Sequence, residues 1–194
     1  WTAIQDAGTT GAPAEGAIGI LAVRASMLRL GRGTRTSFAR LRAAYQNPLH
    51  VSGPRVRYQF NWREGEDTIF GLLTGTRHRN LKVLTPGVPT PRSISRKPDI
   101  AVEDPPGELT LHEVKTGVPG YGGEVAQCEK DAWMTRQATG VDVEDANHNR
   151  RRYTVRGVHW HFMPHNSFDS MGPSQELLDC LIRNSIPYTL HFPV

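Results

Sequence analysis

The chain contains 194 residues with a formal net charge of +4, and 38% of its residues are hydrophobic and 22% charged. This length allows one hydrophobic core, and the composition is typical of a folded, soluble protein. No run of about 18 apolar residues predicts a membrane span. Because no leader peptide follows Trp1, we expect a fragment excised from a longer protein.

Residues 1–50 differ in composition from the rest. Residues 1–33 are rich in Gly, Ala and Thr, which predicts a linker, a helix packed on the main domain, or a remnant of a preceding module. Residues 36–46 carry apolar side chains at helical spacing and end before Asn47-Pro48, which predicts a helix. We therefore expect a basic N-terminal extension or linker over residues 1–50 and the main domain over residues 51–194.

The next elements precede the stretch that bears the chemistry. Residues 55–62 alternate between apolar and polar side chains, which predicts a strand. Residues 63–80 predict a short helix followed by a turn, and residues 81–84 predict another strand. Residues 85–95 contain three prolines and predict a loop.

Residues 96–115 (RKPDIAVEDPPGELTLHEVK) predict a β-hairpin. Its turn, EDPPGE, breaks the strand because proline cannot donate to the ladder and glycine tolerates a tight bend. Strand side chains alternate between faces, so Glu113 and Lys115 share one face. Folding the hairpin back brings Asp99, near the start of the first strand, close to both.

That arrangement predicts a metal site. Two carboxylates a few ångströms apart repel each other, and a divalent cation removes the conflict. Mg²⁺ or Mn²⁺ suits oxygen ligands, so Asp99, Glu113 and the backbone carbonyl of Val114 are the expected ligands. The ammonium group of Lys115 can orient the attacking water or neutralise developing charge. The alternative is a surface hairpin in which Glu113 and Lys115 form an ordinary solvated pair.

Pro98-Asp99, with Glu113-Val114-Lys115 beginning fourteen positions after Asp99, resembles the PD-(D/E)XK signature of restriction-endonuclease-like nucleases. The resemblance implies an α/β (α+β) fold with a central mixed β-sheet flanked by helices. It also implies a metal-dependent endonuclease that hydrolyses phosphodiester bonds, with DNA slightly favoured over RNA.

The same resemblance implies further site residues. Members of the family often carry an acidic residue on the helix before the core sheet, where Glu66 is the best match and Glu64 the second. The alternative is that both acids only complement the positive start of a helix. Members also often carry a Gln on the helix after the second strand, which Gln127 matches. Lys130 on that helix is expected to reach a phosphate, unless both residues are only solvent-facing.

Other basic residues are candidates for contacting nucleic acid. Arg150, Arg151 and Arg152 lie in a predicted polar loop, residues 142–152, and each is a fork-shaped donor that can grip phosphates. Arg96 and Lys97 are further candidates.

The charge distribution agrees with such a partner. Residues 1–60 contain eight Arg and two acids, whereas residues 99–145 contain eleven of the nineteen acids. A basic flank beside an acidic pocket suits a phosphodiester substrate, because cations hold the backbone and carboxylates hold the metal. The alternative is that scattered surface arginines only keep the chain soluble.

The remaining elements alternate between helix and strand. We expect a glycine-rich loop over residues 116–123, a helix over 124–138 and a strand over 153–163 with a bulge at Gly157. A helix capped by Ser174 follows, and its buried residues are expected to be Leu177, Leu178, Leu181 and Ile182. The last predicted element is a strand over residues 188–192.

Two pairs of residues in these elements are expected to be structural. His159 and His161 share a strand face, and without further ligands at defined spacing we expect ordinary polar-face residues. Cys128 and Cys180 are too few for a disulfide framework or a zinc cluster. Both cysteines fall in predicted helices, so we expect buried free thiols.

The order of elements also resembles C-terminal toxin domains of bacterial polymorphic toxins, of the Rhs and contact-dependent-inhibition kind. This resemblance implies a secreted or delivered effector that acts in the cytoplasm of a target cell and has a cognate immunity protein. The alternatives are a tRNA-cleaving ribonuclease toxin, a non-catalytic nucleic-acid-binding module with a decayed site, and a protein-interaction domain whose pocket is incidental.

Overall fold

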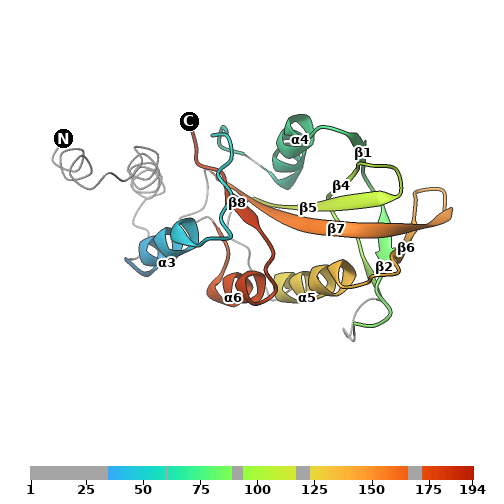
Figure 1. Ribbon diagram of the computed structural model, residues 1–194. Coiled ribbons are helices and arrows are strands. Elements are labelled where there is room, and N and C mark those ends of the chain that lie inside the picture. Colours follow the sequence, from blue (N-terminus) through green and yellow to red (C-terminus); the bar gives the residue numbers. More distant parts are fainter. Residues whose placement is uncertain (1–34, 60, 89–93, 117–122, 166–171) are drawn as a thin grey trace.

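The computed structural model describes residues 35–59, 61–88, 94–116, 123–165 and 172–194 (Figure 1). The predictions for residues 1–33 and for most of the glycine-rich loop lie outside these ranges. Within the described ranges, no helix has both the length and the apolar character that crossing a bilayer requires.

The protein has a mixed α+β fold built around one sheet. The described strands pair in the order β1-β4-β5-β7-β6-β2-β3, and β8 pairs with β7. The pairs β5–β7 and β7–β8 are parallel, and the other described pairs are antiparallel. The strands are β1 (Thr76–His78), β2 (Lys82–Leu84), β3 (Ser95–Arg96), β4 (Ile100–Glu103), β5 (Glu108–Thr116), β6 (Val141–Glu144), β7 (Arg150–Met163) and β8 (Tyr188–Leu190).

Helices cover both faces of this sheet. They are α3 (Arg35–Gln46), α4 (Trp62–Leu72), α5 (Gly123–Thr135) and α6 (Gln175–Arg183). Figure 1 shows α4 on one side of β5, with α5 and α6 on the opposite side of the sheet. The larger core includes Trp160 and Phe162 of β7 with the apolar faces of α5 and α6, and a smaller core joins Ile69 of α4 to Ile100 and Val114. The predicted central mixed sheet flanked by helices is therefore confirmed.

Helix α3 packs on the same body. Its Leu41 and Ala44 are buried in the larger core, and the hydroxyl group of Tyr188 donates a hydrogen bond to the carbonyl oxygen of Ala44. The described part of residues 1–50 is thus held by β8.

Several local predictions from the sequence are confirmed. The hydroxyl of Ser174 accepts a hydrogen bond from the N–H of Leu177 and caps α6. The register between β5 and β7 shifts between Val155 and Gly157, where a bulge was expected. Ile182, expected in the buried stripe of α6, is instead 40% exposed.

The predicted strand over residues 55–62 is wrong. Val56 and Gln59 form only isolated bridges, and Trp62 already begins α4. The helix starts there because Asn61 and Glu64 form a capping box: each side chain accepts a hydrogen bond from the other's backbone N–H. The alternation of apolar residues was therefore outweighed by a helix start signal.

The predicted loop over residues 142–152 is also wrong. Strands β6 and β7 form an antiparallel hairpin in which Asp142 faces Arg152 and Glu144 faces Arg150. Opposite charges on facing positions stabilise strand pairs, and Arg152 Nη1 lies 2.9 Å from Asp142 Oδ1. The charged residues on which the loop prediction rested are thus partners on facing positions of two strands.

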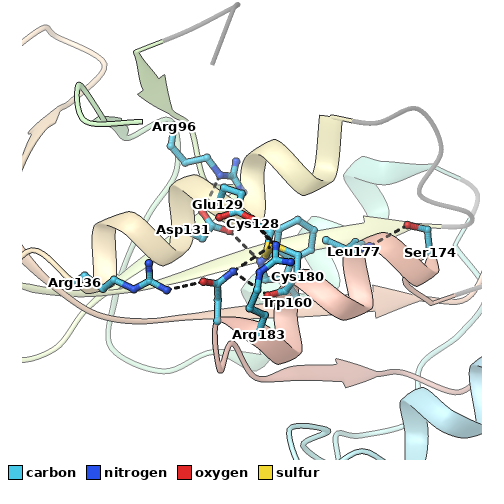
Figure 2. The surroundings of a disulfide bond; sticks show 11 residues. Arg96, Cys128, Glu129, Asp131, Arg136, Trp160, Ser174, Leu177, Cys180 and Arg183 are labelled. Atoms are coloured by element: carbon cyan, nitrogen blue, oxygen red, sulfur yellow. Dashed lines mark hydrogen bonds and ion pairs between the residues drawn. A yellow bond between two sulfur atoms is a disulfide. The ribbon is translucent and has the colours of Figure 1, made fainter. Parts of the chain in front are cut away.

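Cys128 of α5 and Cys180 of α6 form a disulfide, so the expectation of free thiols is wrong. Figure 2 shows the bond beneath the side chains that join the two helices. The two cysteines lie 52 residues apart in sequence, and both are fully buried. Helix periodicity placed each thiol in the core, but it could not show that the two helices pack side by side.

Reduction of this disulfide is expected to lower the free energy of unfolding by about 2–4 kcal/mol, because the cross-link restricts a long loop in the unfolded chain. Urea unfolding with and without reductant measures the effect. The double variant Cys128→Ala/Cys180→Ala is the control, since reductant should not change its midpoint. Equal midpoints for the oxidised and reduced wild type would contradict the expectation.

Candidate functional site

The hairpin β4–β5 brings Asp99 to Glu113 and Lys115. Ile100 of β4 faces His112 of β5 in the antiparallel register. The next pair of facing positions along the hairpin is therefore Asp99 and Glu113. The Asp99 carboxylate accepts a hydrogen bond of 2.7 Å from the backbone N–H of Val114. Lys115 Nζ lies 2.6 Å from Glu113 Oε1. The three residues of the predicted signature therefore lie at one end of the hairpin.

Glu113 is not a solvated surface residue, because its side chain is only 2% exposed. Arg96 Nη2 lies 2.7 Å from Glu113 Oε2, so both carboxylate oxygens have a cationic neighbour. Burial favours a raised pKa for Glu113, but Arg96 and Lys115 outweigh it and hold the pKa below its usual value. Glu113 is therefore ionised at neutral pH despite its burial.

Arg96 itself is positioned from the other side by α5. Its Nε donates a hydrogen bond of 2.9 Å to Asp131 Oδ1, and Trp160 Nε1 donates one of 2.9 Å to Asp131 Oδ2 (Figure 2). Burial raises the pKa of Asp131 to about 6, although Arg96 opposes the change. Asp131, Arg96 and Glu113 form a continuous buried chain of charges, which we call the Arg96 network.

The ionised form of Asp99 is disfavoured at this site. Burial, followed by the negative charge of Glu113, raises its pKa to about 7, against the opposing hydrogen bond from Val114. The pKa of Glu66 is also raised by burial, with Glu113 adding to the effect and Arg79 opposing it. The three acids are thus close enough to disfavour one another's ionised forms.

Glu66 reaches this end of the sheet because α4 approaches β5 closely. The preceding residue, Gly65, is buried, and a Cβ atom there would lie 2.5 Å from Thr116 Oγ1 and 3.4 Å from Val114 Cγ1. A larger residue at position 65 would push the helix away from the strand. The glycine therefore sets the separation between Glu66 and the residues of β5.

A pocket of about 490 Å³ opens beside these acids. Trp62, Arg63 and Glu66 of α4 form one wall, and its other lining residues are Arg79, Asn80, Lys97, Pro98 and Asp99. Arg79 is held in place by an ion pair with Asp67, 2.6 Å long. Lys97 is exposed at the pocket, as expected for a residue that meets an anionic ligand. The pocket thus combines carboxylates with three cationic side chains.

Two predicted nucleic-acid contacts have a structural role instead. Arg96 is only 4% exposed and belongs to the Arg96 network. Lys130 is 6% exposed, and its ammonium group donates a hydrogen bond of 2.9 Å to the carbonyl oxygen of Ser95. Because neither charge is presented to solvent, neither can contact a phosphate at the surface in this conformation.

Arg150, Arg151 and Arg152 are exposed, but they lie far from the acids. Glu113 pairs with Trp160, which is nine residues along β7 from Arg151, or about 30 Å at about 3.3 Å per residue. Arg150 and Arg152 are also engaged with Glu144 and Asp142. The structure therefore separates these arginines from the candidate site.

Gln127 lies on α5, the helix that carries Asp131. Its side-chain oxygen Oε1 is buried and has no hydrogen-bond partner among the described residues. An unpartnered buried oxygen is costly, which is consistent with a polar group kept for a ligand. In the described part of the chain, Gln127 forms no hydrogen bond with Asp99 or Glu113.

A buried histidine chain on the α4 side of the sheet was not predicted. His161 lies 3.0 Å from His112 through one ring nitrogen and 3.0 Å from His191 through the other, and His191 donates to the Pro54 carbonyl oxygen at 3.0 Å. Burial lowers the pKa of His112 to about 4 and holds that of His161 well below its usual value. His161 is thus not the ordinary polar-face residue that the alternation of His159 and His161 predicted.

The histidine chain does not make a metal site. Its ring nitrogens pair in a line and do not converge on one point. More generally, the described part of the chain holds no group of three or more His, Cys, Asp or Glu side chains arranged around a metal ion.

The donor set at the hairpin fits Mg²⁺ or Mn²⁺ in type. These ions take oxygen ligands, and Mg²⁺ is usually held by only one or two carboxylates with water and substrate completing the shell. Asp99 and Glu113 supply two carboxylates, and the Val114 carbonyl is a third oxygen of the same segment. Burial, and after it the charge of Glu113, raises the pKa of Asp99, and a bound cation would offset both effects.

Comparison with known proteins identifies no relative. No protein-family model matches the chain, and neither a curated protein nor a solved structure shows significant similarity to it.

Proposed function

We propose that this protein is a metal-dependent endonuclease with a restriction-endonuclease-like core that hydrolyses phosphodiester bonds in nucleic acid, DNA slightly before RNA. The observation that supports the proposal most is the meeting of Asp99, Glu113 and Lys115 at one end of the β4–β5 hairpin. The cationic pocket beside these residues suits a phosphodiester backbone.

Each residue has a distinct role in this proposal. Asp99 and Glu113, with the Val114 carbonyl, would hold the divalent cation, which would lower the pKa of a bound water molecule and neutralise charge on the phosphoryl group. Lys115 orients the nucleophile or stabilises the developing charge. Glu66 extends the acidic cluster from α4, and Gln127 contributes a polar group from α5. Lys97, Arg63 and Arg79 hold the substrate backbone.

The biological setting is part of the proposal and rests on the sequence resemblance alone. We propose a secreted or delivered antibacterial effector that acts in the cytoplasm of the target cell. A cognate immunity protein would then cover the basic pocket or the acids. Expression in a bacterium without such an inhibitor should be harmful if this setting is right.

Incubation of the purified protein with plasmid DNA, total RNA and tRNA tests the activity. We expect cleavage with Mg²⁺ or Mn²⁺, none with a chelator, and recovery when the metal is restored. The isosteric variant Glu113→Gln should be inactive while retaining the wild-type circular dichroism spectrum. Cleavage that persists in chelator or in Glu113→Gln would remove the mechanism, and cleavage of tRNA alone would identify a ribonuclease.

One specific observation favours a second candidate, a nucleic-acid-binding module with a decayed site. Arg96 and Lys115 already contact both oxygens of Glu113, so a metal must compete with two cations for that carboxylate. This alternative expects salt-sensitive binding without cleavage by any metal, and the same assays with a salt series distinguish it.

A further inference from the structure

Trp62 is an exposed aromatic residue in the pocket beside the candidate site. Its side chain is 59% exposed, and it is the one aromatic among the exposed large hydrophobic side chains of the described residues. It occupies the first position of α4 and lines the pocket that also contains Glu66 and Asp99. Because the exposed ring lines the same pocket as these acids and cations, a ligand bound in the pocket would contact it.

The ring is also close to the proposed reaction centre. Trp62 and Glu66 are four residues apart on α4 and therefore lie on the same helix face. One helical turn corresponds to about 5.4 Å along the axis, so a base on the Trp62 ring would lie close to the acids.

Three cations line the pocket beside the ring, as a polynucleotide backbone would require. The Arg63 guanidinium carbon lies 5.4 Å from the centroid of the Trp62 ring. Arg79 stands over the Phe70 ring at 4.3 Å and is fixed by its ion pair with Asp67. Lys97 is exposed and lines the same pocket. An aromatic platform with flanking cations is the arrangement by which proteins bind single strands, through base stacking and backbone contacts.

We propose that Trp62 is a base-stacking platform and that the substrate is single-stranded nucleic acid or an unpaired nucleotide of a loop. This inference rests on the proposed function, since it names the substrate class of the same site. In the interior of a duplex both faces of each base are covered by neighbouring bases, so away from the duplex ends the ring can stack only on a base that has left the helix. Extruding a base costs a few kcal/mol, and the cost is smallest for unpaired nucleotides.

Binding can be measured without hydrolysis by fluorescence anisotropy in a chelator. The probes are labelled oligonucleotides of about 12 nucleotides, a length within the usual site size: single-stranded DNA, single-stranded RNA of the same sequence, and the blunt DNA duplex. The proteins are the wild type, Trp62→Ala, Trp62→Phe, and the control Leu72→Ala, which removes a 49% exposed side chain from the other end of α4.

We expect Trp62→Ala to lose about 5- to 150-fold in affinity for the single strands, the equivalent of about 1–3 kcal/mol per stacked base. Its duplex binding should hardly change, Trp62→Phe should retain most of the affinity, and Leu72→Ala should match the wild type. A single abasic position should weaken wild-type binding and have less effect on Trp62→Ala. Equal losses on single strand and duplex, or no loss on the single strand, would overturn the inference.

Cleavage of the same oligonucleotides with Mg²⁺ separates this inference from the proposed function. Selective loss of single-strand binding in Trp62→Ala without any cleavage by the wild type supports the stacking platform and rejects the nuclease. Metal-dependent cleavage of single strand and duplex alike, unaffected by Trp62→Ala, supports the nuclease and overturns the platform.

Discussion

Replacing Arg96 by methionine is expected to lower the free energy of unfolding by about 3–5 kcal/mol, the usual cost of leaving a buried charge without its partner. Arg96 is 4% exposed and contacts Glu113 at 2.7 Å and Asp131 at 2.9 Å. Methionine fills a comparable volume but removes the charge that the two acids share. Urea unfolding at several pH values measures the loss.

The loss should depend on pH in a definite direction. Burial alone opposes ionisation of Glu113 and Asp131, and Arg96 lowers the pKa of both carboxyl groups. Without Arg96 both acids have higher pKa values, so the folded state of Arg96→Met must either bind protons or carry uncompensated charge. The destabilisation should therefore be larger at pH 8 than at acidic pH, where both acids are neutral and Arg96 contributes less.

Arg156→Met is the matched control, because Arg156 forms an exposed ion pair with Glu108. Exposed pairs contribute about 0–1 kcal/mol, so this variant should unfold almost like the wild type. If Arg96→Met costs no more than Arg156→Met, or costs the same at every pH, the Arg96 network does not hold Glu113 as we describe.

The sequence was informative where the signal is local. The hairpin 96–115 could be predicted because a proline–glycine turn separates two alternating segments, and the antiparallel register then places Asp99 next to Glu113. The sequence also contains the start signal of α4, the capping box of Asn61 and Glu64, but the strand prediction rested only on the alternation of residues 55–62 and did not use it.

Features that depend on distant partners could not be predicted. Arg96 was taken for a surface cation because its partner Asp131 lies 35 positions away, and only the packing of α5 on the sheet joins them. The disulfide between Cys128 and Cys180 was missed for the same reason. In each case periodicity gives the side of an element on which a residue lies, but it does not identify the residue opposite.

Replacing Asp99 by asparagine is expected to remove metal binding and yet to stabilise the metal-free protein at pH 8. Asparagine keeps an oxygen that can accept the 2.7 Å hydrogen bond from the Val114 N–H, and it carries no charge to repel Glu113. In the wild type, burial and Glu113 raise the pKa of Asp99 to about 7 from 3.8. The stability that its proton provides is present below about pH 4 and is lost as pH rises through about 7.

The size of the gain follows from that shift. Each pKa unit corresponds to about 1.4 kcal/mol, and partial access of solvent reduces the total, so we expect Asp99→Asn to be more stable than the wild type by on the order of 1–3 kcal/mol at pH 8 in chelator. The difference should shrink towards pH 4. Unfolding across a pH series, with Asp142→Asn as an exposed carboxylate control, measures it.

Metal should stabilise the wild type selectively and so reduce or remove the advantage of Asp99→Asn. A cation at 100 times its dissociation constant stabilises the folded wild type by about 2.7 kcal/mol, and it competes with the proton on Asp99, so its effect should grow with pH up to about 7. Asp99→Asn should gain little from Mg²⁺ or Mn²⁺ at any pH. Destabilisation of metal-free Asp99→Asn at pH 8, or equal stabilisation of both proteins by metal, would show that Asp99 is a structural acid, and the metal site would have to be sought elsewhere.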